Sequence, residues 1–234
     1  MIYSMPSPTL TTPDFIFPVY DDAPLVLRLI GDLRSHYPES RLICVTDGRV
    51  DDLALIEGCD VHSVDLIQTS RRLKLPQFGG LWLERLLSAA IEHTDSPYII
   101  RTEGDTRVWR RFEMLPEADI GGTLEHRYGF DFVCGGCVFF KRDSIIKILA
   151  SGLLRDEEYC NNSKYSYERY GLHRYSDEAV SYLPVSCADL ILGSVASRLG
   201  LAIAGWGEVN IQFRDLEKLI DSNPYAATHP HHNV

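Results

Sequence analysis

Two carboxylates, separated by one residue, stand at the end of an apolar run. The run Tyr98-Ile99-Ile100 has β-strand character and leads into the triplet Glu103-Gly104-Asp105. In an extended chain, residues i and i+2 point the same way, so both carboxylates would face one ligand. Oxygen donors placed this way suit a divalent cation, which can neutralise charge on a phosphoryl leaving group. The plainer interpretation is a strand that ends in a polar turn, and the triplet alone does not decide between the two.

The last residues of the chain include candidate metal ligands of a second kind. His229 and His231 flank Pro230, whose ring favours an extended local backbone in which alternate side chains face one way. Imidazole together with carboxylates suits Mn²⁺ better than Ca²⁺, and Mg²⁺ is the other candidate. Taken alone, this segment is more typical of a frayed tail or a purification remnant than of a metal site. Its mixed order is nevertheless unlike a run of six histidines.

Candidate contacts to a nucleotide follow the first two apolar runs. Pro18-Val19-Tyr20 could present backbone groups and a tyrosine to a base, and Asp47 could accept a hydrogen bond from a ring N–H or a ribose hydroxyl. Each is equally well a turn residue, since Asp47-Gly48 is a favoured turn pair. The basic residues Arg71, Arg72 and Lys74 precede Pro76–Gly80 and suit phosphate binding, although a solvated basic loop is slightly favoured.

Two further positions suit contact with a sugar. Gly135-Gly136, expected just before a strand at 137–140, would let a sugar ring approach the backbone. Asp189, at the start of an expected helix over 188–199, is either a general base or an N-cap. Cys134 and Cys137 form a CxxC pair with no second pair, which makes a four-ligand zinc site improbable. The tyrosine-rich stretch 159–175 is either a binding lid or a surface loop.

The elements expected to position these residues alternate between strands and helices. We expect strands over 15–20, 41–46, 61–64, 98–100, 137–140 and 201–204, and helices from 25, over 51–57, 81–93, 143–151 and 188–199. The apolar stripe of the first helix is assigned to Leu25, Leu29 and Leu33. This alternation predicts a single α/β domain, with a mostly parallel central sheet flanked by helices and with ligands at the carboxyl ends of the strands. Residues 1–13 are expected to form a flexible arm before a domain spanning 14–234.

Composition narrows the function further. The chain has 234 residues, 45% hydrophobic content and a formal net charge of -10. This balance disfavours binding to nucleic-acid backbone, which requires clustered Lys and Arg. No apolar run is long enough to span a bilayer, and the first residues lack a signal-peptide profile, so a cytoplasmic location is expected. The six cysteines are scattered, which favours reduced, buried thiols over a disulfide framework.

Taken in order, these motifs resemble the GT-A fold glycosyltransferases, with a Rossmann-like domain, over about residues 14–232. The shared order is a first strand that ends in Pro-Val-Tyr, a second strand that ends at Asp47, the acidic triplet, Gly-Gly-x-x-Phe-Phe, an acidic helix start and a late histidine. The family often has Asp-x-Asp where this chain has Glu103-Gly104-Asp105. The order is more specific than any single motif.

The resemblance implies a nucleotide-sugar donor, most often uridine-linked, a carbohydrate or other hydroxyl acceptor, and transfer of a hexosyl or related sugar. Asp105 would be the principal metal ligand, with Glu103 as its partner and His229 as the late histidine, while His231 and His232 are its rivals. Asp189 would be the base of an inverting reaction, with the pair Asp177-Glu178 as the alternative. If Asp189 is not the base, retention remains open.

Two other functions compete with this one. A sugar-phosphate nucleotidyltransferase shares the chemistry of a metal on a diphosphate, but that class typically has a glycine-rich loop after its first strand, and residues 18–24 contain no glycine. A non-catalytic domain could instead bind a carbohydrate or a protein through the tyrosine-rich stretch. The acidic triplet and the late histidines would then have no task.

Overall fold

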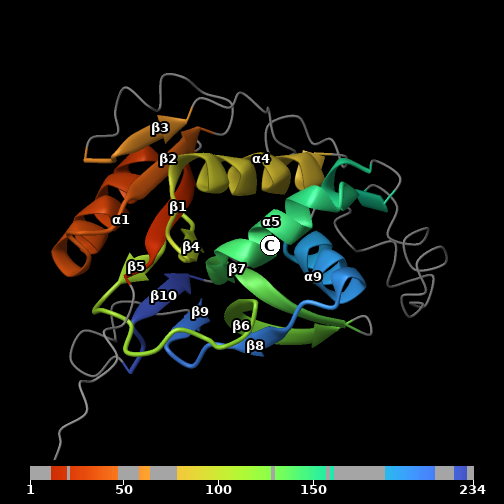
Figure 1. Ribbon diagram of the computed structural model, residues 1–234. Helices are drawn as coiled ribbons and strands as arrows, with labels where there is room; N and C mark the ends of the chain where they lie inside the picture. The colour runs from red at the N-terminus through yellow and green to blue at the C-terminus, as the bar shows by residue number, and fades with distance from the viewer. Residues whose placement is uncertain are drawn as a thin grey trace, which may run out of the picture.

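The computed structural model describes residues 12–19, 22–46, 58–63, 78–127, 130–156, 159–160, 188–213 and 224–230. Figure 1 shows the elements that these residues form. In chain order they are β1 (Asp14–Val19), α1 (Ala23–His36), β2 (Leu42–Thr46), β3 (Val61–Ser63), α4 (Phe78–His93), β4 (Tyr98–Thr102), β5 (Arg107–Val108), β6 (Ile120–Arg127), β7 (Phe130–Lys141), α5 (Arg142–Ala150), a 3₁₀ turn (Leu153–Arg155), α9 (Ala188–Leu199), β8 (Ile203–Gly205), β9 (Val209–Phe213) and β10 (Ala227–Pro230).

A seven-stranded sheet with the order β3-β2-β1-β4-β7-β6-β8 forms the centre of the molecule. The pairs β1–β2, β1–β4, β2–β3 and β6–β8 are parallel, and only β7 runs antiparallel to its two neighbours. The prediction of an α/β fold with a mostly parallel central sheet is therefore confirmed. The parallel strands β1, β2 and β4 end at the same edge of the sheet, which is where ligands are expected to bind.

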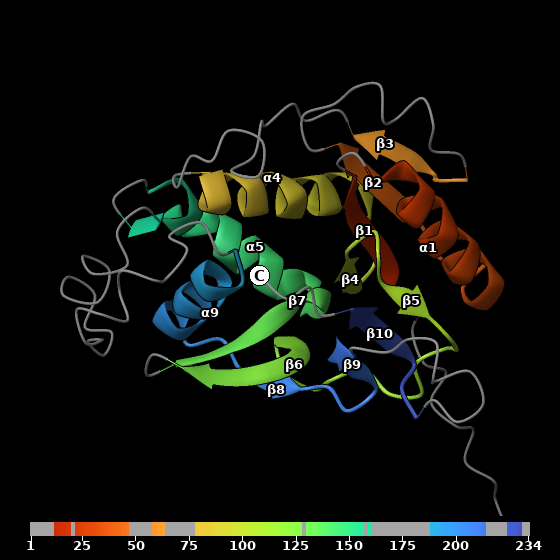
Figure 2. The ribbon, with the colours of Figure 1, turned by 180° about the vertical axis from the view of Figure 1, so that it is seen from behind.

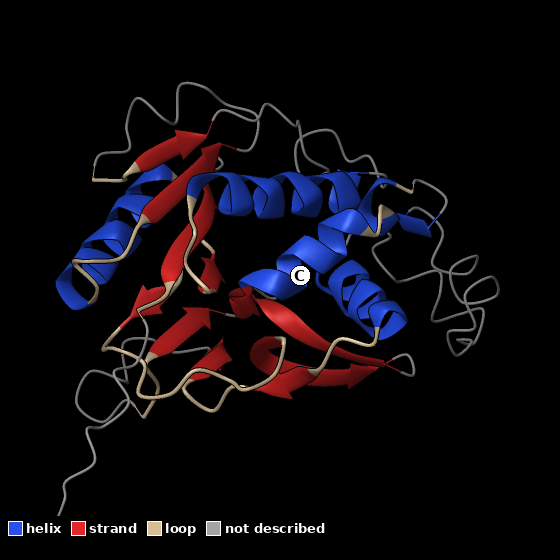
Figure 3. Ribbon diagram, in the orientation of Figure 1, coloured by secondary structure: helices blue, strands red, loops and turns tan. Residues whose placement is uncertain are grey.

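Helices cover both faces of this sheet (Figures 1 and 3). On one face, α4, α5 and α9 pack over apolar residues of β1, β2, β4 and β7. On the other face, α1 packs against Phe15 and Phe17 of β1, and the view from behind shows it beside β3 and β2 (Figure 2). Because the central strands are covered on both sides, they read as continuous apolar runs.

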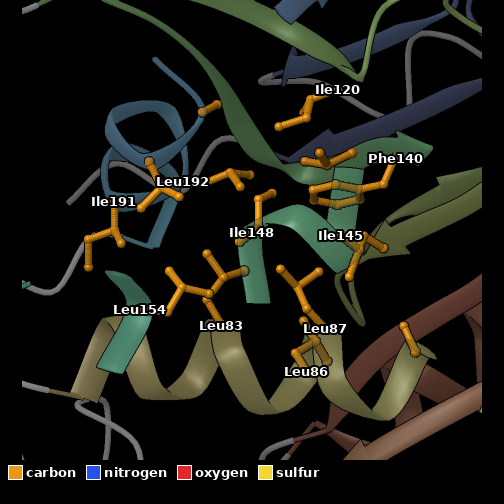
Figure 4. Packing of buried hydrophobic residues seen from close by; sticks show 14 of the residues in the cluster. Leu83, Leu86, Leu87, Ile120, Phe140, Ile145, Ile148, Leu154, Ile191 and Leu192 are labelled. Carbon is orange, nitrogen blue, oxygen red and sulfur yellow. The ribbon is translucent and has the colours of Figure 1, made fainter. Parts of the chain in front are cut away.

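Figure 4 shows the core beneath α4. Leu83, Leu86 and Leu87 of that helix point toward Ile145 and Ile148 of α5, and all five side chains are at most 1% exposed. Their spacing in α4 is the i, i+3, i+4 pattern that places side chains on one helix face. Full burial of a leucine or isoleucine is worth roughly 1.5–3 kcal/mol, so these contacts hold α4 and α5 together.

Two helices differ from their predicted details. In α1 the buried face is formed by Val26, Leu29, Ile30 and Leu33, whereas Leu25 is 38% exposed, so its assignment to the apolar stripe is wrong. The helix α4 begins at Phe78 rather than at residue 81, and it takes in Gly79 and Gly80, which were expected to lie in a loop, either phosphate-binding or solvated. A methyl group on Gly80 would lie 2.4 Å from Cys160 Sγ, so this glycine permits close packing.

The strand β7 is longer than predicted. It runs from Phe130 to Lys141, so Gly135 and Gly136 lie inside the strand rather than before it. Similarly, β8 covers Ile203–Gly205 instead of beginning at residue 201. Glycines are weak strand formers, and a pattern based on β-branched and aromatic residues therefore missed the first half of β7.

Near the end of the chain, β10 is the middle strand of a small sheet with the order β5-β10-β9. Thr228 pairs with Arg107 of β5 and with Asn210 of β9, and β10 also contacts β7. The interpretation of this segment as a frayed tail is therefore wrong for Ala227–Pro230. Among the described residues, no helix combines the length and the apolar character needed to cross a bilayer.

Candidate active site and metal centre

The acidic triplet forms a tight turn directly after β4. The strand ends at Thr102, and the Thr106 N–H donates to the Glu103 carbonyl over 3.0 Å, which closes the turn. The Thr106 hydroxyl accepts from the Glu103 N–H over 3.3 Å and donates to the Gly136 carbonyl of β7 over 2.6 Å. The expected extended geometry is therefore incorrect, and the two carboxylates converge because the turn is held by Thr106.

Gly104 allows this turn to approach the start of α1. A methyl group at this position would lie 2.7 Å from both Asp22 Oδ2 and Val26 Cγ2, closer than nonbonded atoms normally come to a methyl carbon. The Arg28 guanidinium donates to the Asp105 carbonyl over 3.3 Å and holds the turn from the same side. The glycine between the two carboxylates thus has a steric cause.

His229 of β10 completes a three-residue cluster. Its Nε2 lies 2.7 Å from Asp105 Oδ1 and 3.1 Å from Glu103 Oε2. One ligand atom from each of these residues lies within 4.8 Å of the other two. The side chains are 12–24% exposed, so the cluster is shielded by protein but still reachable from outside. Residues 126 positions apart are brought together because β10 packs beside β7.

The position of His229 depends on Gly136. A methyl group on Gly136 would lie 2.3 Å from His229 Cγ and 2.4 Å from its Cβ, which means that the imidazole packs directly over this glycine. The neighbouring Gly135 likewise makes room for two side chains, those of Asp189 and Arg101. A methyl group on it would lie 2.7 Å from Asp189 Oδ1 and 2.8 Å from Arg101 Nη2. The paired glycines in β7 make room for the side chains of the site.

Asp189 lies in the first turn of α9, but its carboxylate points across the site. Its Oδ2 accepts from the Gly135 N–H over 2.9 Å, and its Oδ1 lies 3.4 Å from Arg101 Nη1. The second nitrogen of that guanidinium, Nη2, lies 2.7 Å from Glu103 Oε1. These bonds connect Asp189 to β7 and β4 rather than along its own helix. Arg101 therefore joins Asp189 to the acidic triplet.

Burial and neighbouring charges shift two ionisable groups of the site. Burial raises the pKa of Asp189, Arg101 opposes that shift and Glu103 adds to it. For His229, burial alone would lower the pKa, but hydrogen bonds from its ring to Asp105 and Glu103 outweigh this and raise it to about 9. Without a metal ion, His229 is therefore protonated at neutral pH and its proton is shared with two carboxylates.

The donor set fits a divalent cation. Two carboxylate oxygens and one imidazole nitrogen lie within 4.8 Å of one another, and imidazole together with carboxylates suits Mn²⁺ better than Ca²⁺. A cation bound by these atoms would replace the proton on His229 Nε2. Three protein ligands leave several coordination positions for phosphate oxygens or water.

The structure brings together five of the residues singled out from the sequence, namely Glu103, Asp105, Gly135, Asp189 and His229, with Gly104 and Gly136 packed beside them. Pro18 and Val19 form the end of β1, and Val19 is fully buried there. The remaining candidates lie outside the described residues: Tyr20, Asp47, Arg71, Arg72, Lys74, Asp177, Glu178, His231 and His232. Of the tyrosine-rich stretch, Tyr159 is described; it is buried, and its hydroxyl bonds to Ser194.

Sequence reasoning missed Arg101, although a signal was present. An arginine inside the otherwise apolar run Tyr98–Thr102 is unusual for a central strand, because a buried charge requires partners. Its guanidinium is also stacked over the Trp82 ring of α4 at 5.1 Å. Thr106, which holds the turn, follows the triplet directly, but its residue type gives no comparable signal.

No protein-family model matches the sequence, and no curated protein is significantly similar to it. Among solved structures, the chain is similar to galactosyltransferase LgtC in complex with donor and acceptor sugar analogues, with 12% identity and a TM-score of 0.49 over 94% of this chain and 87% of that one. It is also similar to an active-site mutant of LgtC, with 12% identity and a TM-score of 0.48 over 94% and 88% of the two chains.

Proposed function

We propose that this protein is a metal-dependent glycosyltransferase that moves a sugar from a uridine-linked nucleotide donor to a hydroxyl acceptor. The observation that carries the proposal is the convergence of Glu103, Asp105 and His229 at the carboxyl end of β4, with the Asp189 carboxylate connected to them through Arg101. A cation site and a separate carboxylate at this edge of a parallel sheet supply the two functions that glycosyl transfer from a diphosphate needs.

Glu103, Asp105 and His229 would hold the ion. A divalent ion bound there would supply positive charge to the nucleoside diphosphate as it leaves. The two protein carboxylates carry negative charge that would repel a diphosphate in the ion's absence, so we expect nucleotide binding to depend on the metal. Asp47, Tyr20, Arg72 and Lys74 remain the proposed contacts to the base, the ribose and the phosphates.

Asp189 is the proposed base. In a single displacement, the acceptor oxygen bonds to the anomeric carbon, the bond from that carbon to the diphosphate oxygen breaks, and the acceptor proton passes to an Asp189 oxygen. The side chain is 23% exposed, so one edge is accessible, and its pKa is raised by burial, which makes it a better proton acceptor than an ordinary aspartate. This step inverts the anomeric carbon. The pair Asp177-Glu178 is the alternative base.

The test is calorimetric titration of UDP, GDP and CMP into the full-length protein, with and without Mn²⁺. We expect one nucleotide, UDP, to bind only when Mn²⁺ is present, and we expect Asp105→Asn and Asp105→Ala to lose that binding. Asp131→Asn is the matched control because Asp131 is exposed, pairs with His126 at the end of the β6–β7 hairpin and lies outside the cluster. Thermal melts establish that each variant is folded.

The outcomes separate the competing functions. Binding of no nucleotide under either condition would overturn the proposal and favour a non-catalytic carbohydrate- or protein-binding domain. Binding of UDP that persists without Mn²⁺ and in both Asp105 variants would overturn the assigned metal site. Once a sugar donor is identified, NMR of the first product formed distinguishes inversion from retention. Retention would remove Asp189 from the role of base.

A further inference from the structure

Arg101 lies behind the site rather than in it. Its side chain is 2% exposed, whereas those of Glu103 and Asp189 are 24% and 23% exposed. It projects from β4 toward α4, where its guanidinium stacks over Trp82. Burial of a cation this deep in the protein is energetically costly unless the cation is paired, so the carboxylates around Arg101 are needed to stabilise its charge.

Each end of the guanidinium meets a different carboxylate. Nη2 lies 2.7 Å from Glu103 Oε1, and Nη1 lies 3.4 Å from Asp189 Oδ1. The second Glu103 oxygen, Oε2, faces His229 Nε2 at 3.1 Å. Glu103 therefore presents a single oxygen to the metal cluster, because its other oxygen is held by Arg101.

Asp189 lies beside Glu103 but outside the group of ligand atoms formed by Glu103, Asp105 and His229. Asp189 Oδ1 and Glu103 Oε1 lie 2.7 Å and 3.0 Å from one point, the position of a methyl group on Gly135. Arg101 Nη2 lies 2.8 Å from that point, so the guanidinium already supplies positive charge between the two carboxylates. Hard divalent cations bind carboxylate oxygens readily, and an unpaired Asp189 beside the cluster would be an additional ligand.

We propose that Arg101 is a positioning residue that separates the carboxylates that bind the metal ion, Glu103 and Asp105, from the carboxylate that accepts a proton, Asp189. It leaves Glu103 and Asp105 to the metal ion, and it keeps Asp189 out of the ion's coordination shell so that this carboxylate remains free to receive a proton from the acceptor. The inference rests on the proposed function. It differs from a purely structural role in one respect, namely that loss of the arginine should strengthen metal binding rather than weaken it.

The experiment titrates Mn²⁺ into the metal-free full-length protein and follows the electron paramagnetic resonance signal of the free ion. Asp189→Asn is expected to bind Mn²⁺ with an affinity within about twofold of the unaltered protein. Arg101→Met is expected to bind Mn²⁺ about tenfold more tightly. Adding Asp189→Asn to Arg101→Met is expected to reverse most of that gain, because mutations of residues in contact are coupled. Arg34→Met, which removes an ion pair with Asp60 away from the cluster, is the matched control and should leave the affinity unchanged.

Arg101→Lys guards against misfolding of Arg101→Met, because lysine retains the positive charge. A lysine ammonium cannot hold both carboxylates as the planar guanidinium does, so Mn²⁺ binding is expected to tighten by about threefold. If Arg101→Met does not fold, tighter binding in Arg101→Lys together with an unchanged affinity in Asp189→Asn supports the proposal, and weaker or unchanged binding in Arg101→Lys overturns it. A loss of affinity of about tenfold or more in Asp189→Asn would identify Asp189 as a metal ligand and overturn it. Weaker or unchanged binding in a folded Arg101→Met would overturn it as well.

Failure of this inference can be distinguished from failure of the proposed function. If the unaltered protein binds neither Mn²⁺ nor a nucleotide, the glycosyltransferase proposal fails. If the unaltered protein shows Mn²⁺-dependent nucleotide binding while the Arg101 and Asp189 variants depart from the expected pattern, only the role of Arg101 is wrong.

Discussion

The core beneath α4 and the carboxylate cluster at the end of β4 are held together by different means. Each helix brings several neighbouring residues to the core, as α4 does with Leu83, Leu86 and Leu87, and apolar burial holds them there. The cluster instead takes one or two residues from each of β4, the turn after it, α9 and β10, and it is held by ion pairs and by glycines that make room. We therefore expect most of the fold's stability to come from the core and metal binding to depend on the cluster.

The largest effect that separates the two regions is expected for Leu83→Ala. Leu83 is fully buried, and truncation of a buried leucine typically lowers the free energy of unfolding by about 2–5 kcal/mol. Chemical denaturation measures this loss, and the Mn²⁺ affinity of the folded variant should be unchanged. Leu25→Ala is the matched control because Leu25 is 38% exposed, and it should cost less than about 1 kcal/mol. A Leu83 variant that loses Mn²⁺ binding while folded would show that the regions are coupled.

The cluster should make its own contribution to stability, and that contribution should depend on pH. In metal-free protein the pKa of His229 is raised from 6.5 to about 9, so its ion pairs stabilise the fold fully below pH 6.5 and are lost as the pH rises through 9. The loss between pH 6 and pH 9.5 should be up to about 3 kcal/mol. Unfolding free energies measured in EDTA at the two pH values give this quantity.

The matched variant for the pH experiment is His229→Gln, in which the ionisable ring is gone. Subtracting its pH dependence from that of the unaltered protein removes the contribution of all other groups. The difference should fall toward zero as the pH rises through 9. If the difference does not change with pH, His229 is not protonated between the carboxylates in the folded protein.

The two regions also differ in how far the sequence predicts them. Apolar spacing located α1, α4, α5 and α9 and the strands at the centre of the sheet, because burial of one helix face or of a whole strand leaves a local pattern. The pattern failed at Leu25, which lies one position away from the buried Val26, and at Gly135, since glycine carries no strand signal. Local spacing is informative about which residues are buried and less so about where an element begins.

The cluster was predictable in most of its members, Arg101 excepted, but not in its geometry. Carboxylates, a histidine and paired glycines are recognisable residue types, whereas the contact of His229 with Asp105 depends on the pairing of β10 with β5 and β9, which no local pattern encodes. The role of the glycines also changed. They were read as space for a sugar ring, a reading that stays a prediction, and the structure shows them packed against His229, Arg101 and Asp189.

A smaller effect should separate two glycine positions. In Gly136→Ala the added methyl group would lie 2.3 Å from His229 Cγ, so the imidazole must move, and we expect Mn²⁺ affinity to fall by about tenfold, or about 1.4 kcal/mol. Gly31→Ala in α1 is the matched control, since nothing lies within 4 Å of its added methyl group. That variant should keep its Mn²⁺ affinity and gain about 0.4–1 kcal/mol of stability. Equal Mn²⁺ affinities in both variants would argue against His229 as a ligand.

The smallest effect concerns Thr102, the residue where the two regions meet. It is the last residue of β4 and fully buried, and among the described residues its hydroxyl has no hydrogen-bond partner. Thr228 of β10 is equally buried, but its hydroxyl accepts from the Trp109 indole over 2.9 Å. Burial of a hydroxyl has a net cost when the hydroxyl has no partner, so Thr102→Val should leave the unfolding free energy unchanged or raise it by up to about 1 kcal/mol. Thr228→Val removes a hydroxyl that has a partner, so it should lower the unfolding free energy by about 1–2 kcal/mol.

Urea denaturation of both valine variants measures the two values under the same conditions, and far-UV circular dichroism confirms that the folds are retained. If Thr102→Val is as destabilising as Thr228→Val, the Thr102 hydroxyl has a bound partner such as water, and the polar network around Glu103 extends one residue further into β4. If Thr102→Val is neutral or stabilising, the network begins at the turn. The boundary between the apolar strand and the charged site then lies between Thr102 and Glu103. Arg101 is the one charged residue of the site that lies on the strand side of this boundary.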